Sequence, residues 1–365
     1  MADADEPREV PPAGASDARA AHLEGLLRAF AAARAALPAP PAYAWAWTYD
    51  GREAGDEGAP HIGASALIHG DEVGPLEGLL DVMEALSQGK LSFRGRLTCL
   101  LGNPEAARAG RRFLEDDLNR VFRALTPEEE AAGAAALPTH EARRAQELAP
   151  LLDSFDLYVD FHQTILPAAQ PFYICPWSGE GWRWARLMGG ARAWVTRHPA
   201  RGGGGLACAD ERVRLRGKPS LALELGALGF SPEARAAVWR SLSRAFRAVD
   251  SLSGLRGADR LDALDALARA QPELKFYETT ARAPLHDPRA ALRPGWVNFS
   301  EVREGELLSP PGAAVEVRAP ASGALLFPKY PPRDAAGAAL HPAPSELFRV
   351  VSPLTDHPLA LWGEG

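Results

Sequence analysis

The sequence predicts an α/β protein: a mixed, largely parallel sheet with helices on both faces, followed by a small C-terminal β domain. Two observations predict the sheet. Apolar runs of strand length, such as 62–68 and 157–161, alternate with stretches of helical periodicity, such as 73–86. Continuous apolar runs, in which polar residues do not alternate with apolar ones, are typical of strands buried on both faces of a sheet. The third observation is a change to short segments at turn-like spacing after about residue 256, which predicts the β domain.

The length of 365 residues allows one large core and a smaller second domain. Residues 1–20 are dominated by Pro, Ala, Gly and Asp without visible periodicity, which predicts a disordered tail. The main domain is expected over residues 21–256. A linker helix and the β domain are expected over residues 257–365.

Within the main domain, apolar periodicity and the Gly and Pro punctuation predict the elements in order. They are a helix that ends near residue 37, a strand at 62–68, a helix that closes at Gly89, a strand at 96–103, a helix at 139–152, strands at 156–161, 171–176 and 219–226, and a helix at 231–249. A further helix at 258–270 leads to short β segments at 274–284, 295–299, 305–309, 313–320, 322–328 and 346–351.

Charge and composition exclude several classes of partner. The formal net charge of -7 provides no positive field for nucleic acid or for an anionic membrane. The N-terminus is acidic and lacks the apolar run of a signal peptide, and no segment is long and apolar enough to span a bilayer. The three cysteines are far apart and show no CxxC spacing, so a cytoplasmic location is expected. The oligomeric state stays open, with a homo-oligomer among the alternatives.

Three expected strands end in residues that suit a metal centre. His69 and Glu72 lie three residues apart in the turn after one strand, His162 ends the second and Glu224 closes the third. The carboxyl ends of parallel strands meet at one sheet edge, and catalytic zinc takes three protein ligands with one open position. Each motif alone has a simpler explanation, as a structural turn, a hydrogen-bonded Asp160–His162 pair or a helix cap. The combination favours a metal site.

A second cluster of polar residues lies in the segment 103–122. Arg111, Arg112 and Arg120, together with Asn119, concentrate donors that could bind a carboxylate or stabilise an oxyanion. The alternative is a solvated helix face on which the neighbouring acids pair locally.

These motifs carry a resemblance to a known family. HGDE, NPEAARAGRRF, DLNR, DFH and ELG occur in the order seen in the succinylglutamate desuccinylase and aspartoacylase family, a relative of the zinc carboxypeptidases. The similarity extends from about Ile62 to Gly226, and more faintly into the C-terminal β segments. The chain departs from the family at Asp71, where an Asn is common, and in the segment ALGFSPEAR after Glu224.

The resemblance implies one zinc ion per chain and a role for each matching residue. Zinc would be held by His69, Glu72 and His162, and Glu224 would activate water. Arg112 would polarise the scissile carbonyl, and Asn119 and Arg120 would bind a substrate carboxylate. Asp117 would orient a ligand histidine, and Asp160, two residues before His162, is expected to support the ligands as well. The same ligand set also suits other first-row divalent metals.

The function implied is hydrolysis of the amide bond of an anionic N-acyl amino acid. N-succinylglutamate is the favoured substrate, cleaved to succinate and glutamate. The alternatives are an aspartoacylase-like deacylase of another N-acyl amino acid, a carboxypeptidase-like peptidase, and a non-catalytic binding protein on the same fold.

Overall fold

The computed structural model describes residues 13–53, 58–123, 137–198, 208–331 and 344–364, with residues 126, 128, 129, 133, 333, 335 and 337–339 between them. The helices are α1 (Ala13–Ala35), α2 (Pro75–Ser87), α3 (Pro104–Arg108), the 3-10 helix η1 (Leu118–Arg120), α5 (His140–Asp153), α6 (Gly179–Met188), α7 (Ala209–Leu215), α8 (Pro232–Ser251), α9 (Gly257–Arg269) and α10 (Pro358–Trp362). The strands are β1 (Ala46–Asp50), β2 (His61–Ala66), β3 (Arg96–Leu101), β4 (Leu157–Thr164), β5 (Phe172–Ile174), β6 (Ala193–Thr196), β7 (Ser220–Ala227), β8 (Lys275–Pro284), β9 (Glu301–Val302), β10 (Gly323–Leu326) and β11 (Glu346–Pro353).

Within the described residues, 11 strands join one sheet in the order β1-β3-β2-β4-β7-β5-β6-β8-β11-β10-β9. Strands β3, β2, β4 and β7 run parallel to one another, as do β5, β6 and β8. Antiparallel pairs join β1 to β3 and β5 to β7, and the strands beyond β8 are all antiparallel. The predicted fold class, a mixed and largely parallel sheet with a C-terminal β region, is confirmed.

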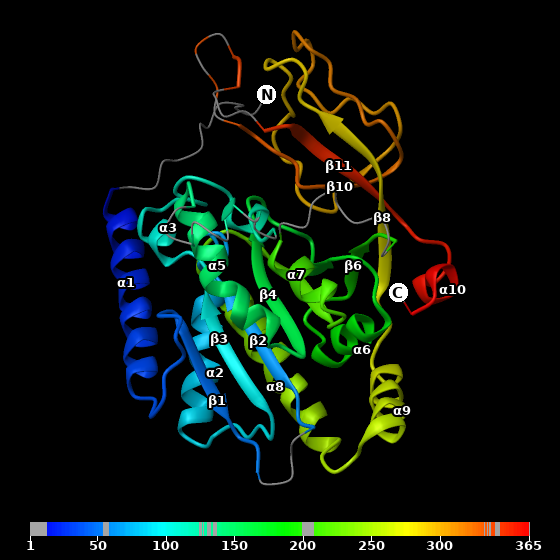
Figure 1. Cartoon of the computed structure of the whole chain (residues 1–365). Helices are drawn as coiled ribbons and strands as arrows, with labels where there is room; N and C mark the ends of the chain where they lie inside the picture. Colours follow the sequence, from blue (N-terminus) through cyan, green and yellow to red (C-terminus); the bar gives the residue numbers. More distant parts are fainter. Residues whose placement is uncertain are drawn as a thin grey trace.

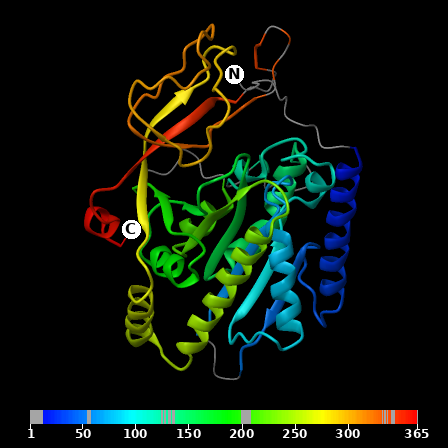
Figure 2. The ribbon, with the colours of Figure 1, turned by 180° about the vertical axis from the view of Figure 1, so that it is seen from behind.

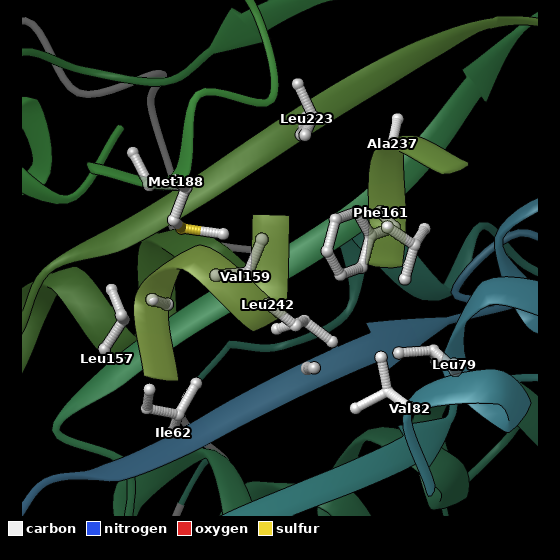
Figure 3. Close-up of a cluster of buried hydrophobic side chains, with 14 of the residues drawn as sticks. Ile62, Leu79, Val82, Leu157, Val159, Phe161, Met188, Leu223, Ala237 and Leu242 are labelled. Atoms are coloured by element: carbon white, nitrogen blue, oxygen red, sulfur yellow. The ribbon is translucent and has the colours of Figure 1, made fainter. Parts of the chain in front are cut away.

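Helices cover both faces of the parallel part of the sheet (Figures 1 and 2). One core cluster joins α1, α2, α6 and α8 to the sheet, and a second joins α5 and α7 to the opposite face. Strand β4 contributes to both core clusters, because successive side chains of a strand point to opposite faces of the sheet. Leu157, Val159 and Phe161 belong to the first cluster (Figure 3). Tyr158 belongs to the second. Asp160 and His162 therefore face the α5 and α7 side.

The C-terminal strands extend the central sheet through β8. Residues 275–278 pair with β6, and residues 277–284 pair with β11, which carries β10 and β9 beside it (Figure 1). A separate hydrophobic core fills this region, with Phe348 and Leu325 fully buried in it. The expected segments at 295–299, 305–309 and 313–320 make only isolated bridges. The division into domains at residue 256 stays a prediction.

The predicted tail over residues 1–20 needs a correction. Helix α1 begins at Ala13, and residues 1–12 lie outside the described residues. The helix starts early because its first turns are rich in alanine, the best helix former, even though they show no apolar periodicity.

Within the described part of the chain, no helix is long and apolar enough to cross a membrane. All three cysteines are free. The cytoplasmic location stays a prediction.

Candidate metal centre and substrate pocket

The predicted ligands come together at the carboxyl ends of β2, β4 and β7. In the parallel pairing of β4 with β7, His162 lies directly beside Glu224. His69 and Glu72 follow the end of β2, the neighbour of β4 on the other side. The side chains of His69, Glu72, His162 and Glu224 are all buried.

Gly70 allows the turn after β2 to lie against the segment that carries Arg112. The Gly70 amide donates to the carbonyl oxygen of Arg112 at 2.8 Å. A Cβ atom at position 70 would lie 2.4 Å from the amide nitrogen of Ala107 and 2.6 Å from the carbonyl oxygen of Arg111. Both obstacles are backbone atoms, so only glycine fits here without moving the loop.

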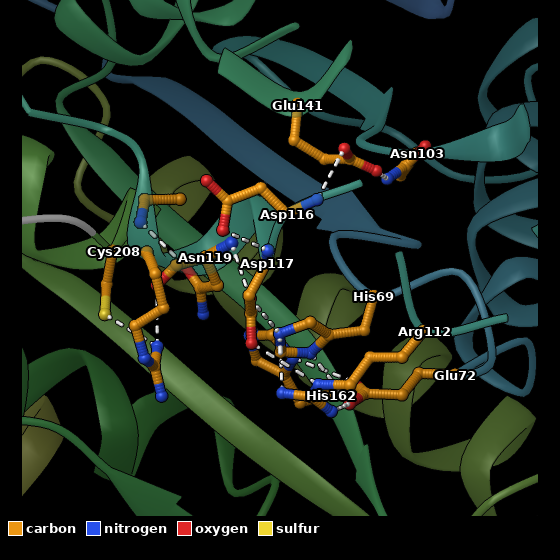
Figure 4. A network of polar contacts seen from close by, with 12 residues as sticks. His69, Glu72, Asn103, Arg112, Asp116, Asp117, Asn119, Glu141, His162 and Cys208 are labelled. Atoms are coloured by element: carbon orange, nitrogen blue, oxygen red, sulfur yellow. Dashed lines mark hydrogen bonds and ion pairs between the residues drawn. The ribbon is translucent and has the colours of Figure 1, made fainter. Parts of the chain in front are cut away.

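The donor atoms of His69, Glu72 and His162 fit a divalent metal. Ligand atoms from the three residues lie within 4.8 Å of one another. Nδ1 of His69 lies 2.8 Å from Oε1 of Glu72, and Nδ1 of His162 lies 2.8 Å from Oε2 (Figure 4). An imidazole lone pair and a carboxylate that face each other this closely repel unless a proton or a cation lies between them. Two imidazole nitrogens and a carboxylate are a ligand set that zinc commonly takes.

The outer nitrogen of each histidine faces an aspartate. Nε2 of His162 lies 2.8 Å from Asp160 Oδ2, and Nε2 of His69 lies 3.1 Å from Asp117 Oδ1. A proton held on Nε2 by these carboxylates leaves Nδ1 free to bind metal. Ser65 donates to Asp160 Oδ1 at 2.7 Å and fixes that carboxylate in turn.

Arg112 contacts the same group of side chains. Its Nη1 donates to Glu72 Oε1 at 3.1 Å and its Nε to Asp117 Oδ2 at 3.4 Å, while Nη2 lies 2.7 Å from His69 Nε2. His69 can therefore accept from Arg112, with its proton on Nδ1, or donate to Asp117, with its proton on Nε2. Only the second tautomer presents Nδ1 to a metal.

Electrostatics separates the two glutamates of the site. Burial opposes the charge of Glu72, but His69 and His162 hold the pKa of this carboxyl well below its usual value. Burial raises the pKa of Glu224 to about 7, and the nearby Glu72 adds to the shift. Oε2 of Glu224 is buried and has no hydrogen-bond partner within the described ranges. Glu72 is thus a charged ligand candidate, and Glu224 is a carboxyl that can exchange a proton near neutral pH.

Asn119 and Arg120 lie in η1, beside the start of α7. Oδ1 of Asn119 accepts from the amide of Ala209 at 2.9 Å. Nη1 of Arg120 donates to the carbonyl oxygen of Asn119 at 2.6 Å and to Cys208 Sγ at 3.3 Å. Among the residues that the structure describes, no carboxylate pairs with Arg120, so its guanidinium is available to an anionic ligand.

A cavity of about 430 Å³ opens over these groups. Its lining includes His69, Glu72, Arg112, Asn119, Arg120, His162 and Glu224, whereas Asp117 and Asp160 lie behind the histidines. Sequence reasoning missed several charged residues of the wall, namely Arg197, Asp210, Glu211, Lys329, Glu346 and Arg349. The last three come from the C-terminal β region and have no motif in the sequence that marks them.

Comparisons with known proteins identify a family. Residues 60–249 match the model of the succinylglutamate desuccinylase/aspartoacylase catalytic domain. A succinylglutamate desuccinylase from Yersinia pseudotuberculosis is 30% identical over 258 residues, which cover 67% of this chain and 72% of that protein. One from Pseudomonas fluorescens is 35% identical over 189 residues, and this match spans about half of either chain, 50% and 51%.

Solved structures show the same fold. Succinylglutamate desuccinylase from Vibrio cholerae superposes with a TM-score of 0.59 at 19% identity, over 85% of each chain. Murine aminoacylase 3 superposes with a TM-score of 0.52 at 20% identity, over 81% of this chain and 95% of the other.

Proposed function

The chain belongs to the succinylglutamate desuccinylase/aspartoacylase family, and from this premise we propose that it is a zinc-dependent amidohydrolase acting on an N-acyl amino acid. The observation that carries the proposal is the His–Glu–His donor set beside an unpaired, buried Glu224 in the neighbouring strand.

His69, Glu72 and His162 would hold one zinc ion per chain. A divalent ion in this position supplies a Lewis acid, which polarises a carbonyl group and makes water a stronger acid. Asp117 and Asp160 would keep the proton of each histidine on Nε2, so that both Nδ1 atoms stay available as ligands.

Glu224 would act as the general base. A carboxylate with a pKa of about 7 can take a proton from the attacking water and return it to the departing amine. Its unpaired Oε2 is the atom that can hold this proton between the two steps.

Arg112 and the η1 residues would orient the substrate. The guanidinium of Arg112 lies at the metal ligands and would stabilise the oxyanion that develops on the carbonyl. Arg120, together with the amide of Asn119, would bind a substrate carboxylate, because a guanidinium without a carboxylate partner favours such a ligand.

We propose N-succinylglutamate as the first substrate to test. The named relatives support it, and so does the wall of the cavity, where Lys329 and Arg349 lie 3.6 Å and 2.7 Å from a single carboxylate, Glu346. Two cations beside one carboxylate at this end of the cavity favour an anionic acyl group. Another N-acyl amino acid or a C-terminal peptide would use the same chemistry.

The first experiment is metal analysis of the wild type and of His162→Ala, with hydrolysis of N-succinylglutamate and N-acetylaspartate followed on both. We expect about one zinc per chain, lost with activity in the variant. A wild type that takes up no metal when zinc is supplied would leave only the non-catalytic binding function.

A further inference from the structure

Arg112 and Asp117 lie in a loop that needs support from outside itself. The loop runs from the end of α3 to η1 and has no helical or strand pairing of its own between residues 111 and 117. Backbone amides in such a segment require other partners when they are shielded from water. The side chains that supply these partners therefore determine where Arg112 and Asp117 lie.

Glu141, in the first turn of α5, supplies most of these partners. Its Oε1 accepts from the amide of Leu114 at 2.7 Å, and its Oε2 accepts from the amides of Glu115 and Asp116, both at 3.1 Å. Asn103 Nδ2 donates to Oε1 at 2.8 Å (Figure 4). Glu141 is fully buried, at 0% exposure. A buried carboxylate with four donors is a strong and directional anchor.

A further hydrogen bond joins the loop to α5, this time with the donor on α5 and the acceptor on the loop. Oε2 of Glu115 accepts from the amide of His140, at the start of α5. Asn103 also holds the start of α3, because its Oδ1 accepts from the amide of Ala106 at 3.3 Å. The anchor thus connects the ends of β3, α3 and α5 to the loop.

We propose that Glu141 is a positioning residue, which acts on the metal centre and the scissile carbonyl through Asp117 and Arg112 without touching either. The inference rests on the proposed function for its activity readout. Glu141 is absent from the lining of the cavity, so it has no direct route to a substrate. Its effect must pass through the loop, where Asp117 faces His69 and Arg112 faces Glu72.

The test uses Glu141→Gln, which has nearly the same shape. Glutamine keeps one acceptor oxygen but turns an NH₂ group toward donors, so at least one side of the anchor is lost. Thr139→Ala is the matched control. It removes the cap of the same helix, in which Thr139 Oγ1 accepts from the amide of Ala142 at 3.1 Å, and leaves the loop contacts intact. Asn103→Ala, which removes one donor to Glu141, serves if Glu141→Gln proves unstable.

The first readout is zinc affinity, measured by competition with a chelator. We expect Glu141→Gln to weaken zinc binding about tenfold and Asp117→Asn about 10- to 100-fold. The double variant should be no weaker than Asp117→Asn alone, because both changes act through the same histidine. Thr139→Ala should bind zinc as the wild type does.

The second readout is the split between kcat and KM on N-succinylglutamate. Glu141→Gln should lower kcat about 10- to 100-fold with little change in KM, and it should add nothing in an Arg112→Ala background. The inference would be overturned by additive losses when Glu141→Gln is combined with Asp117→Asn and with Arg112→Ala. It would also be overturned by a Glu141→Gln variant that matches Thr139→Ala. If the wild type hydrolyses no N-acyl amino acid, the proposed function fails, and the zinc cycle still decides the role of Glu141.

Discussion

The buried, unpaired carboxyl of Glu224 should make the stability of the metal-free protein depend on pH. Its pKa lies at about 7 in the folded chain, against 4.5 for an ordinary glutamate. A carboxyl whose pKa is raised by folding stabilises the native state below pH 4.5, and this contribution is lost as the pH rises through 7. A shift of this size corresponds to about 3 kcal/mol, since one pKa unit is worth about 1.4 kcal/mol.

Glu224→Gln removes this titration while keeping nearly the same shape. Urea unfolding of the metal-free wild type and variant, measured from pH 4.5 to pH 8, should therefore show two profiles that diverge. Relative to the wild type, the variant should gain about 3 kcal/mol in the free energy of unfolding across this range. Titrating groups that do not interact with Glu224 are common to both proteins and cancel in the difference.

An exposed glutamate provides the control. Glu233 lies in the first turn of α8 on the surface, and Glu233→Gln makes the same chemical change away from the cavity and is measured over the same pH range. Parallel profiles for the wild type and Glu224→Gln would refute the reasoning, because they would show that Glu224 titrates alike in the folded and unfolded chains. Zinc-loaded Glu224→Gln should also lose hydrolysis by a factor of at least about 10² while keeping its metal.

Three further predictions concern the surroundings of the metal centre. Asp160→Asn should weaken zinc binding about 10- to 100-fold, measured by chelator competition, because the amide no longer requires the proton of His162 on Nε2. Gly70→Ala should lower the free energy of unfolding by about 1–3 kcal/mol through backbone overlap, whereas Gly25→Ala, with open space around it in α1, should raise it slightly; urea unfolding measures both. Arg120→Ala should raise KM for N-succinylglutamate by about tenfold or more in steady-state assays, with a smaller change in kcat, and an unchanged KM would exclude it from carboxylate binding.

Much of the fold could be predicted because the sequence patterns are local. The apolar runs of β2, β4 and β7 and the periodicity of α2 and α8 are unambiguous, and each corresponds to an element of the structure. Strands β1 and β6 were not predicted. Both are short, with five residues in β1 and four in β6, and apolar runs of this length do not distinguish a strand from a loop.

The residues expected at the site could be named because strand order brings them together. His162 and Glu224 lie near the carboxyl ends of strands that pair in parallel, so the sheet itself places them side by side. Glu141 could not be recognised in this way. Its position in the first turn of a helix is ordinary for an acid, and its role depends on where the 111–117 loop lies in space. Such a relation is set by tertiary packing and leaves no periodic signal.

The division of the pocket between two parts of the chain limits what the family relationship says about substrate. The residues proposed for metal binding and catalysis fall between His69 and Glu224, inside the matched range 60–249. Lys329, Glu346 and Arg349 of the cavity wall lie beyond it, in strands and turns attached through β8. Because the chemistry and this part of the recognition surface come from different segments, one can change while the other is kept. Substitution of Lys329 and Arg349 should therefore alter the choice of acyl group more than the binding of metal, and measurement of both on the same variants would separate the two functions.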